Sequence, residues 1–248
     1  MTPMSDRRAV FNRARLATLE VIDADNDVSY GSAFAVHRKH GPGVIVSAAH
    51  VLQPTDETPP THFRFFIVDS DATTNEWGAQ SVLLRIDASA VVVHESHDLA
   101  AIQYPDTRFP EGQTLELAMR SAPKVGDQVA TFGWPATTPN LLDREVIIAP
   151  TACAGIVSDI FPHPEMPLGT HAFYLVQLPL HPGNSGGPIF DLRTGSVIGI
   201  VSKRLAQKVV GIVDDVLADS VMIMHGLTSA VPIHHFASLD FPRLRRAE

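Results

Sequence analysis

The sequence of 248 residues contains a single cysteine, Cys153, and fewer basic than acidic residues. One cysteine cannot form an intrachain disulfide, which excludes the disulfide scaffold of many secreted proteins and leaves any metal site dependent on other ligands. With 19 Lys and Arg against 27 Asp and Glu, the net charge is −8 and the pI is near 5.8. Because nucleic-acid-binding proteins usually carry a basic surface, we expect no nucleic-acid partner.

Long hydrophobic runs are also absent. The first 19 residues include four arginines but no apolar stretch long enough for the core of a signal peptide, and no later run approaches the length of a membrane span. We therefore expect a cytoplasmic protein with no membrane partner. A chain trimmed of an export signal would have the same sequence, so the compartment stays open at this point.

Apolar residues make up 45% of the chain and charged residues 19%, which provides enough apolar surface for a folded core. Short runs rich in β-branched residues recur on both sides of a turn-rich loop at 105–112, a pattern that indicates β-barrels or sandwiches. We predict a helical segment at 1–16, a first β-rich unit at 17–110 and a second at 111–248. The runs lie at 18–22, 33–36, 44–47, 63–68, 82–86 and 90–93, and then at 128–132, 146–148, 173–178, 188–190, 196–201 and 221–224.

The strongest motif is Pro182-Gly183-Asn184-Ser185-Gly186-Gly187-Pro188. A serine hydroxyl is a weak nucleophile that needs an adjacent base, and donors must stabilise the oxyanion that it creates. The glycines allow positive φ angles, so that the amides of Gly183 and Ser185 can converge on one point as an oxyanion hole. A plain glycine-rich turn between two strands is the alternative, and we favour the functional interpretation.

Two further motifs supply partners for this serine. His50 follows the apolar run 43–46 and is preceded by the small residues 47–49. An imidazole exchanges protons near neutral pH, which suits a general base. Asp98 opens the apolar run 99–102, where its carboxylate can accept the Nδ1–H of an imidazole and fix its tautomer. Taken singly, a core histidine and a turn aspartate are the ordinary interpretations. The order His, Asp, Ser predicts a triad with His50 as general base, Asp98 as its orienting group and Ser185 as nucleophile.

Together these motifs resemble the trypsin-like peptidases of the chymotrypsin clan, and they are most similar to the protease domain of the high-temperature-requirement (HtrA) group. The resemblance implies an all-β fold of two six-stranded antiparallel β-barrels with the active site in the cleft between them. It also implies a serine endopeptidase that forms an acyl-enzyme, needs no cofactor and cleaves a polypeptide substrate. We expect a bare protease domain without the PDZ domain of that group. Further similar segments lie at 31–36, 125–134, 154–158, 195–200 and 226–232.

The resemblance places the substrate-binding pocket between the segment before the serine motif and the strand after it. The segment directly before the serine motif, 178–181, holds no aspartate to pair with a basic side chain, so we expect a small or medium aliphatic residue before the scissile bond rather than Arg or Lys. Lys203 and Arg204 can favour an acidic group instead, but on an edge loop such residues are more often solvated. The expected pocket residues are Pro179, Leu180, His181, Ile200, Val201 and Ser202.

The 12 histidines invite comparison with a metal site. Zinc sites need three or four ligands with supporting hydrogen bonds, and the spaced pairs here have no helix to place them on one face and no cysteine partner. We therefore expect no metal. The pairs are His37 with His40, His94 with His97, and His234 with His235.

Other functions stay open from sequence alone. A protease-fold module can bind peptide without cutting it, or stay inactive until a protein partner orders its active-site loops, and an activating protein partner is an expectation of this alternative. The connectors 135–143 and 158–169 are candidate activation loops. Ester hydrolysis is a further alternative, because the same nucleophile and oxyanion hole support it.

Overall fold

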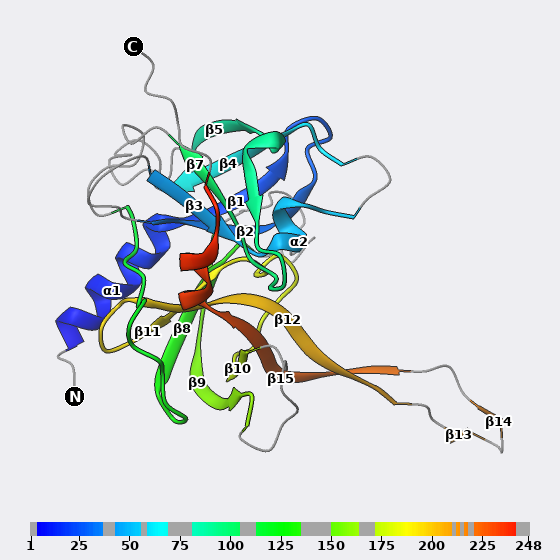
Figure 1. The fold of residues 1–248 in the computed structure, drawn as a ribbon. Coiled ribbons are helices and arrows are strands. Elements are labelled where there is room, and N and C mark those ends of the chain that lie inside the picture. The colour runs from blue at the N-terminus through cyan, green and yellow to red at the C-terminus, as the bar shows by residue number, and fades with distance from the viewer. Residues whose placement is uncertain are drawn as a thin grey trace, which may run out of the picture.

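The computed structural model is built mainly of β-strands in two antiparallel sheets, which lie one above the other in Figure 1. The expected double-barrel, all-β fold is confirmed. None of the helices in the described part of the chain is long and apolar enough to cross a membrane. The structure describes residues 4–36, 43–55, 59–68, 81–104, 113–134, 150–163, 172–209, 212–213, 216–217 and 221–241.

The N-terminal sheet has seven strands, one more than expected, in the order β5-β4-β1-β2-β3-β7-β6. The strand Ala100–Tyr104, expected as the apolar run that Asp98 opens, pairs with β3 and β6. Its two alanines have low β-propensity, yet both are fully buried, so packing rather than propensity stabilises this strand. The strands are β1 (Thr18–Asp23), β2 (Ser29–Val36), β3 (Gly43–Ser47), β4 (His62–Val68), β5 (Ser81–Asp87), β6 (Val91–Val93) and β7 (Ala100–Tyr104).

The C-terminal sheet is a closed six-stranded barrel in the order β10-β15-β12-β11-β8-β9. Strand β9 was not expected from the sequence. The run expected at 146–148 lies outside the described residues. Strands β12 and β15 continue beyond the barrel as a long ribbon toward β13 (Ile212–Val213) and β14 (Val216–Leu217) (Figure 1). The barrel strands are β8 (Gln128–Gly133), β9 (Thr151–Phe161), β10 (Phe173–Gln177), β11 (Pro188–Asp191), β12 (Val197–Val209) and β15 (Val221–Pro232).

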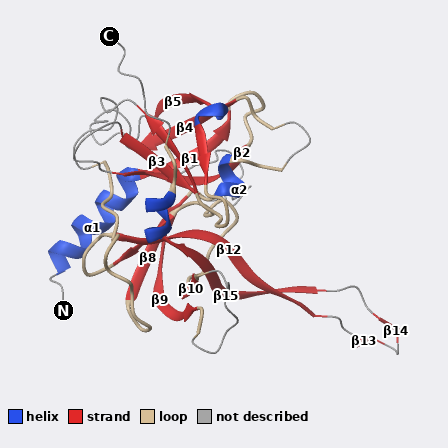
Figure 2. Cartoon of the chain, in the orientation of Figure 1, coloured by secondary structure: helices blue, strands red, loops and turns tan. Residues whose placement is uncertain are grey.

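Helix α1 (Met4–Ala17), labelled in Figure 2, lies along the side of the two sheets. Its apolar residues recur at helical spacing, and Ala14 and Ala17 are fully buried in the core that the two sheets share. Phe11 packs edge-on against Phe132 of β8 and Phe190 of β11, with ring centroids 5.9 and 5.8 Å away. The helix thus contributes to the same core that supports the strands around the serine motif.

The connection between the two sheets pairs with both of them. Leu115 donates its backbone N–H to Ala35 of β2, and two residues later Leu117 forms a parallel bridge with Val197 of β12. This short stretch therefore connects an inner strand of the N-terminal sheet to a strand of the barrel. The boundary expected at 110 and 111 lies outside the described residues and stays a prediction.

Candidate active site

The serine motif forms a tight loop between β10 and β11. Gly183 and Gly186 have φ angles of 91° and 83°, in the region that favours glycine. A Cβ on Gly186 would overlap the carbonyl oxygen of Ser32 and the hydroxyl of Ser47, both in the N-terminal sheet. Only glycine fits there, because the loop of the C-terminal barrel is packed directly against the other sheet.

Two buried serines of the N-terminal sheet hold this loop in place. Ser32 donates its backbone N–H to the Ser185 carbonyl over 2.8 Å and its hydroxyl to the Gly183 carbonyl over 2.7 Å. The same hydroxyl accepts the backbone N–H of Trp134 over 2.8 Å, and Ser47 donates its hydroxyl to the Ser32 carbonyl over 2.6 Å. The position of Ser185 is therefore set by strands of both sheets.

His50 and Asp98 are brought together as the sequence analysis predicted. His50 lies on the short helix α2 (Ala49–Leu52) after β3, and Asp98 lies in the loop between β6 and β7. The imidazole Nδ1 is 2.8 Å from Asp98 Oδ2 and 3.0 Å from Oδ1, and the His50 backbone N–H also donates to Oδ1 over 3.0 Å. Because an ionised carboxylate only accepts hydrogen bonds, Nδ1 carries the proton and Nε2 keeps its lone pair.

The Asp98 carboxylate is stabilised in its ionised form. Burial alone raises its pKa, but hydrogen bonds from the His50 side chain, the Ser202 hydroxyl and the His50 backbone, together with attraction to His50, lower the pKa of Asp98 to about 2. The Ser202 hydroxyl donates to Asp98 Oδ2 over 2.6 Å. Asp98 therefore stays charged over the whole physiological pH range and can hold the imidazole in one orientation.

Ser202 contacts both Ser185 and Asp98. The Ser185 hydroxyl donates to the Ser202 carbonyl over 3.4 Å, which is long for an O–H···O hydrogen bond. In the part of the chain that the structure describes, no hydrogen bond joins Ser185 to His50. Both residues nevertheless line one cavity, and the His50 side chain is 42% exposed there. The Ser185 hydroxyl is thus held by one weak interaction beside a cavity that His50 also lines.

The backbone amides of the loop differ in their partners. Those of Asn184 and Gly186 donate to the carbonyls of His181 and Val201 over 3.2 and 2.8 Å. Among the described residues, the amides of Gly183 and Ser185 donate to no protein group. They are therefore available to an acceptor from outside. The Asn184 side chain is completely buried beneath the loop, beside Gly133.

The cavity has a volume of about 400 Å³ and contains four of the six expected pocket residues. Pro179 is not among the residues that line it, and the fully buried Ile200 packs in the shared core, so its side chain does not reach the cavity. Lys203, which we considered as a residue that can favour an acidic group, joins the lining, and so does Pro182, which was not expected there. The lining consists of His50, Leu180, His181, Pro182, Ser185, Val201, Ser202 and Lys203.

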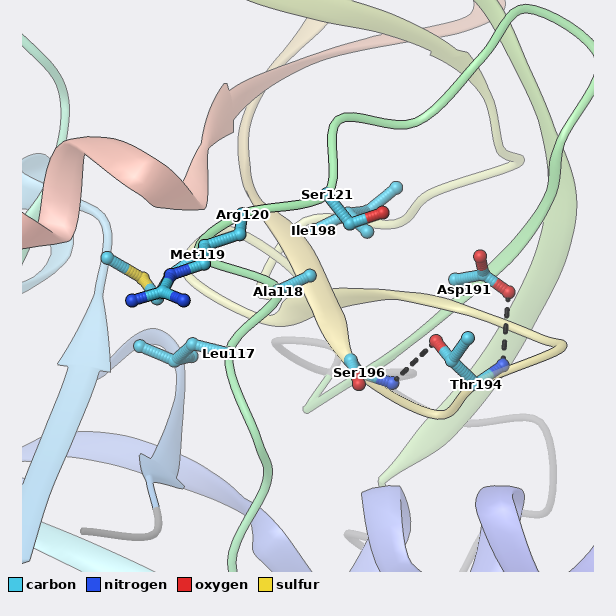
Figure 3. Close-up of a pocket in the computed structure, with 9 residues that line it drawn as sticks. All are labelled: Leu117, Ala118, Met119, Arg120, Ser121, Asp191, Thr194, Ser196 and Ile198. Carbon is cyan, nitrogen blue, oxygen red and sulfur yellow. Dashed lines mark hydrogen bonds between the residues drawn. The ribbon is translucent and has the colours of Figure 1, made fainter.

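A second cavity, of about 380 Å³, is shown in Figure 3. Asp191 at its edge accepts the backbone N–H of Thr194, whose hydroxyl in turn accepts the N–H of Ser196. These bonds close the turn between β11 and β12. None of the described residues that line this cavity is a histidine. Its lining is Leu117, Ala118, Met119, Arg120, Ser121, Asp191, Thr194, Ser196 and Ile198.

Three histidines come together beside the loop that carries Asp98. His94 and His97 lie in that loop, and His235 lies near the C-terminus, with candidate ligand atoms of all three within 4.8 Å of one another. From the sequence we considered only pairs of histidines that are close in the chain. We did not expect His235 beside His94 and His97. His37 and His40 lie outside the described residues.

Comparison with known proteins gives one family. The model of the trypsin-like peptidase domain matches residues 31–200, which include all three members of the predicted triad. A curated relative, the uncharacterized protein y4bJ of Sinorhizobium fredii, is 32% identical over 127 residues, which are 49% of this chain. The match spans only 17% of that relative's length.

Solved structures with this fold include two bacterial proteases. A serine endoprotease from Yersinia pestis superimposes with a TM-score of 0.59 at 18% identity, over 96% of this chain and 65% of that one. The inactive and active forms of the Rv3671c protease from M. tuberculosis each give a TM-score of 0.57 at 16% identity, over 96% of this chain and 93% and 85% of theirs. At these identities the similarity shows the fold alone.

Proposed function

Because the chain belongs to the trypsin-like peptidase domain family, we propose that it is a serine endopeptidase acting on polypeptides through Ser185, His50 and Asp98. One observation carries this proposal. His50, which Asp98 orients through Nδ1, lines the same cavity as Ser185. A base, its orienting carboxylate and a serine on a glycine-rich loop are the groups that acyl transfer requires.

The proposed reaction begins when the Ser185 oxygen attacks the scissile carbonyl and His50 Nε2 takes the hydroxyl proton. The amides of Gly183 and Ser185 then bind the oxyanion of the tetrahedral intermediate. His50 returns the proton to the leaving amine as the peptide bond breaks, which leaves an ester on Ser185. A water molecule, deprotonated by His50, hydrolyses this acyl-enzyme and restores the serine.

Before the attack, the Ser185 hydroxyl must turn from the Ser202 carbonyl to His50. The present contact of 3.4 Å is weak, and hydrogen bonds of catalytic groups are often long before substrate binds. The same observation favours the second candidate function, a module whose activity depends on a partner that reorients Ser185. The two candidates differ in whether the isolated chain cleaves substrate.

The cavity walls support a preference for an aliphatic side chain before the scissile bond. Leu180 and Val201 form its apolar part and are only 6% and 2% exposed. The described lining holds no carboxylate that would pair with a substrate Arg or Lys. Lys203 and His181 are exposed at the lining, where they contact solvent and approaching substrate.

Digestion of a denatured protein mixture, with the new termini identified by mass spectrometry, tests this proposal. We expect cleavage after aliphatic residues by the unmodified chain, loss of cleavage in Ser185→Ala, and normal cleavage in Ser229→Ala, a control at a serine of β15 outside the cavity. Equal cleavage by Ser185→Ala would overturn the assignment of the nucleophile. Cleavage that appears only after another protein is added would support the second candidate function.

A further inference from the structure

His94, His97 and His235 form a compact group that the proposed reaction does not use. His94 and His97 lie between β6 and β7, and His235 lies on the 3-10 helix η3 (Ile233–Ser238) that follows β15. All three side chains are half-buried, and ligand atoms from each lie within 4.8 Å of one another. The N-terminal sheet and the segment after the C-terminal barrel thus bring imidazole nitrogens together in one place.

The spacing of these rings suits a single small ion. The Nδ1 atoms of His94 and His97 are 3.4 Å apart. Two nitrogens bound tetrahedrally to Zn²⁺ at 2.0–2.1 Å lie about 3.4 Å from each other. The His235 ring stacks on that of His97, with centroids 3.6 Å apart, and its centroid is 5.8 Å from that of His94. The His97 and His235 planes are 23° apart, so these two rings must turn before nitrogens of all three residues face one ion.

Ser238 fixes the protonation of His94. Its hydroxyl donates to the His235 carbonyl over 2.7 Å, so in its 2.8 Å contact with His94 Nε2 it acts as the acceptor. Nε2 therefore carries the proton, and Nδ1 is an acceptor, which takes the backbone N–H groups of Ser96 and His97 over 3.2 Å each. A bound ion would replace these two contacts. Metal-binding histidines commonly donate their second ring N–H to a protein oxygen in this way, which orients the ring and raises its basicity.

We propose that His94, His97 and His235 bind one Zn²⁺ ion, with water in the fourth position. Three imidazoles without a carboxylate suit Zn²⁺ and similar transition metals rather than Mg²⁺ or Ca²⁺, which prefer oxygen ligands. The ion would join η3, which follows the C-terminal barrel, to the loop of the N-terminal sheet that carries Asp98. This site goes beyond the proposed peptidase function and does not depend on it.

Zinc titration by calorimetry tests the site, with ZnCl₂ added to the chelator-treated full chain. The Ser185→Ala background removes any self-digestion and makes the result independent of peptidase activity. We expect one high-affinity Zn²⁺ per chain. Loss of a group that only orients a ligand costs about 10–100-fold in metal affinity, so Ser238→Ala should bind that much more weakly and His235→Gln at least about 100-fold more weakly.

His163→Gln is the matched control, because this half-buried histidine pairs with Asp159 away from the cluster. It should bind Zn²⁺ like the parent chain. Circular dichroism establishes whether each variant is folded, and Zn²⁺ should raise the melting temperature of the parent but not of folded His235→Gln. Absence of one-to-one binding, or equal affinity in the parent, His235→Gln and Ser238→Ala, would overturn the proposal. If His235→Gln does not fold, the exposed Ser238→Ala decides alone.

Discussion

The hydroxyl of Ser202 donates to Asp98 Oδ2 over 2.6 Å, the same carboxylate oxygen that accepts His50 Nδ1–H over 2.8 Å. Ser202 belongs to β12 of the C-terminal barrel, whereas Asp98 and His50 belong to the N-terminal sheet. The Ser202 carbonyl also accepts the hydroxyl of Ser185. One residue thereby contacts both the orienting carboxylate and the proposed nucleophile, which makes it a positioning residue across the cavity.

Ser202→Ala should lower kcat/KM by roughly 10–100-fold, because hydrogen bonds to charged groups contribute about 1.5–3 kcal/mol. The variant also removes one cause of the lowered Asp98 pKa, so that pKa should rise. Peptide hydrolysis measured between pH 4 and 9 separates positioning from a general loss of structure. Ser229→Ala, in which the lost bond is to the Lys203 carbonyl, should match the parent at every pH. Parallel losses in both variants would speak against a role for Ser202 at Asp98.

Asp98 should also make stability depend on pH in acid. Its pKa is lowered by folding to about 2, against about 3.9 in an unfolded chain, so its contribution is present above pH 4 and is lost as pH falls toward 2. Urea unfolding at pH 5, 4, 3 and 2 measures this. The stability difference between the parent and Asp98→Asn should shrink over that interval, because the other carboxylates are common to both. A constant difference would contradict the assigned pKa.

Asp98→Asn should leave the fold intact but reduce turnover by about 10⁴, the loss seen in the reference triad when the imidazole is held in the wrong tautomer. Initial rates on a cleavable peptide, with circular dichroism as the folding control, measure the effect. Near-normal turnover in a folded variant would exclude Asp98 as the residue that orients His50.

Gly186→Ala should disrupt the serine loop more than Gly126→Ala disrupts its own turn. Both glycines have a positive φ, so each substitution costs about 1–2 kcal/mol in backbone strain. Only at Gly186 would the new Cβ overlap Ser32 and Ser47, whereas nothing lies within 4 Å at Gly126. Crowding should add about 1–3 kcal/mol at Gly186 and abolish peptidase activity. Similar urea midpoints for the two variants would contradict this packing.

Ser32→Ala should destabilise the junction between the sheets. The Gly183 carbonyl and the Trp134 N–H would each lose a buried partner, at about 1–3 kcal/mol per group. Urea unfolding gives the change in the free energy of unfolding, and peptidase activity should fall with it because Gly183 is freed to move. A loss below 0.5 kcal/mol, roughly that of an ordinary surface change, would show that water replaces the hydroxyl.

The three residues proposed for catalysis are each marked by a local motif in the sequence. Ser185 is recognisable from its flanking glycines, and His50 and Asp98 from their positions beside apolar strands and from their order. Strand β7, which begins with two alanines, was expected only as the short apolar strand that Asp98 opens, and strand β9, in which only Val157 is fully buried, was not assigned. Both lack the density of buried β-branched residues that marks a strand, because pairing with their neighbours stabilises them instead.

Contacts between distant segments could not be predicted. Ser32 and Ser202 look like ordinary strand serines, and their roles arise only where the two sheets meet, across 151 residues to Gly183 and 104 residues to Asp98. The third histidine of the cluster was missed for the same reason, since His94 and His235 are adjacent only in the folded chain. Ile200 was placed in the pocket because it is near the serine motif in the paired strand, but its side chain is buried in the core.

Reaction of the purified chain with a fluorophosphonate probe tests the central claim most directly, because this reagent labels only serines that a neighbouring base activates. Tandem mass spectrometry of the digested adduct locates the label. We expect one adduct, on Ser185, that is lost in Ser185→Ala and formed far more slowly in Asp98→Asn. No adduct under any condition, or an adduct on another serine that persists in Ser185→Ala, would contradict it.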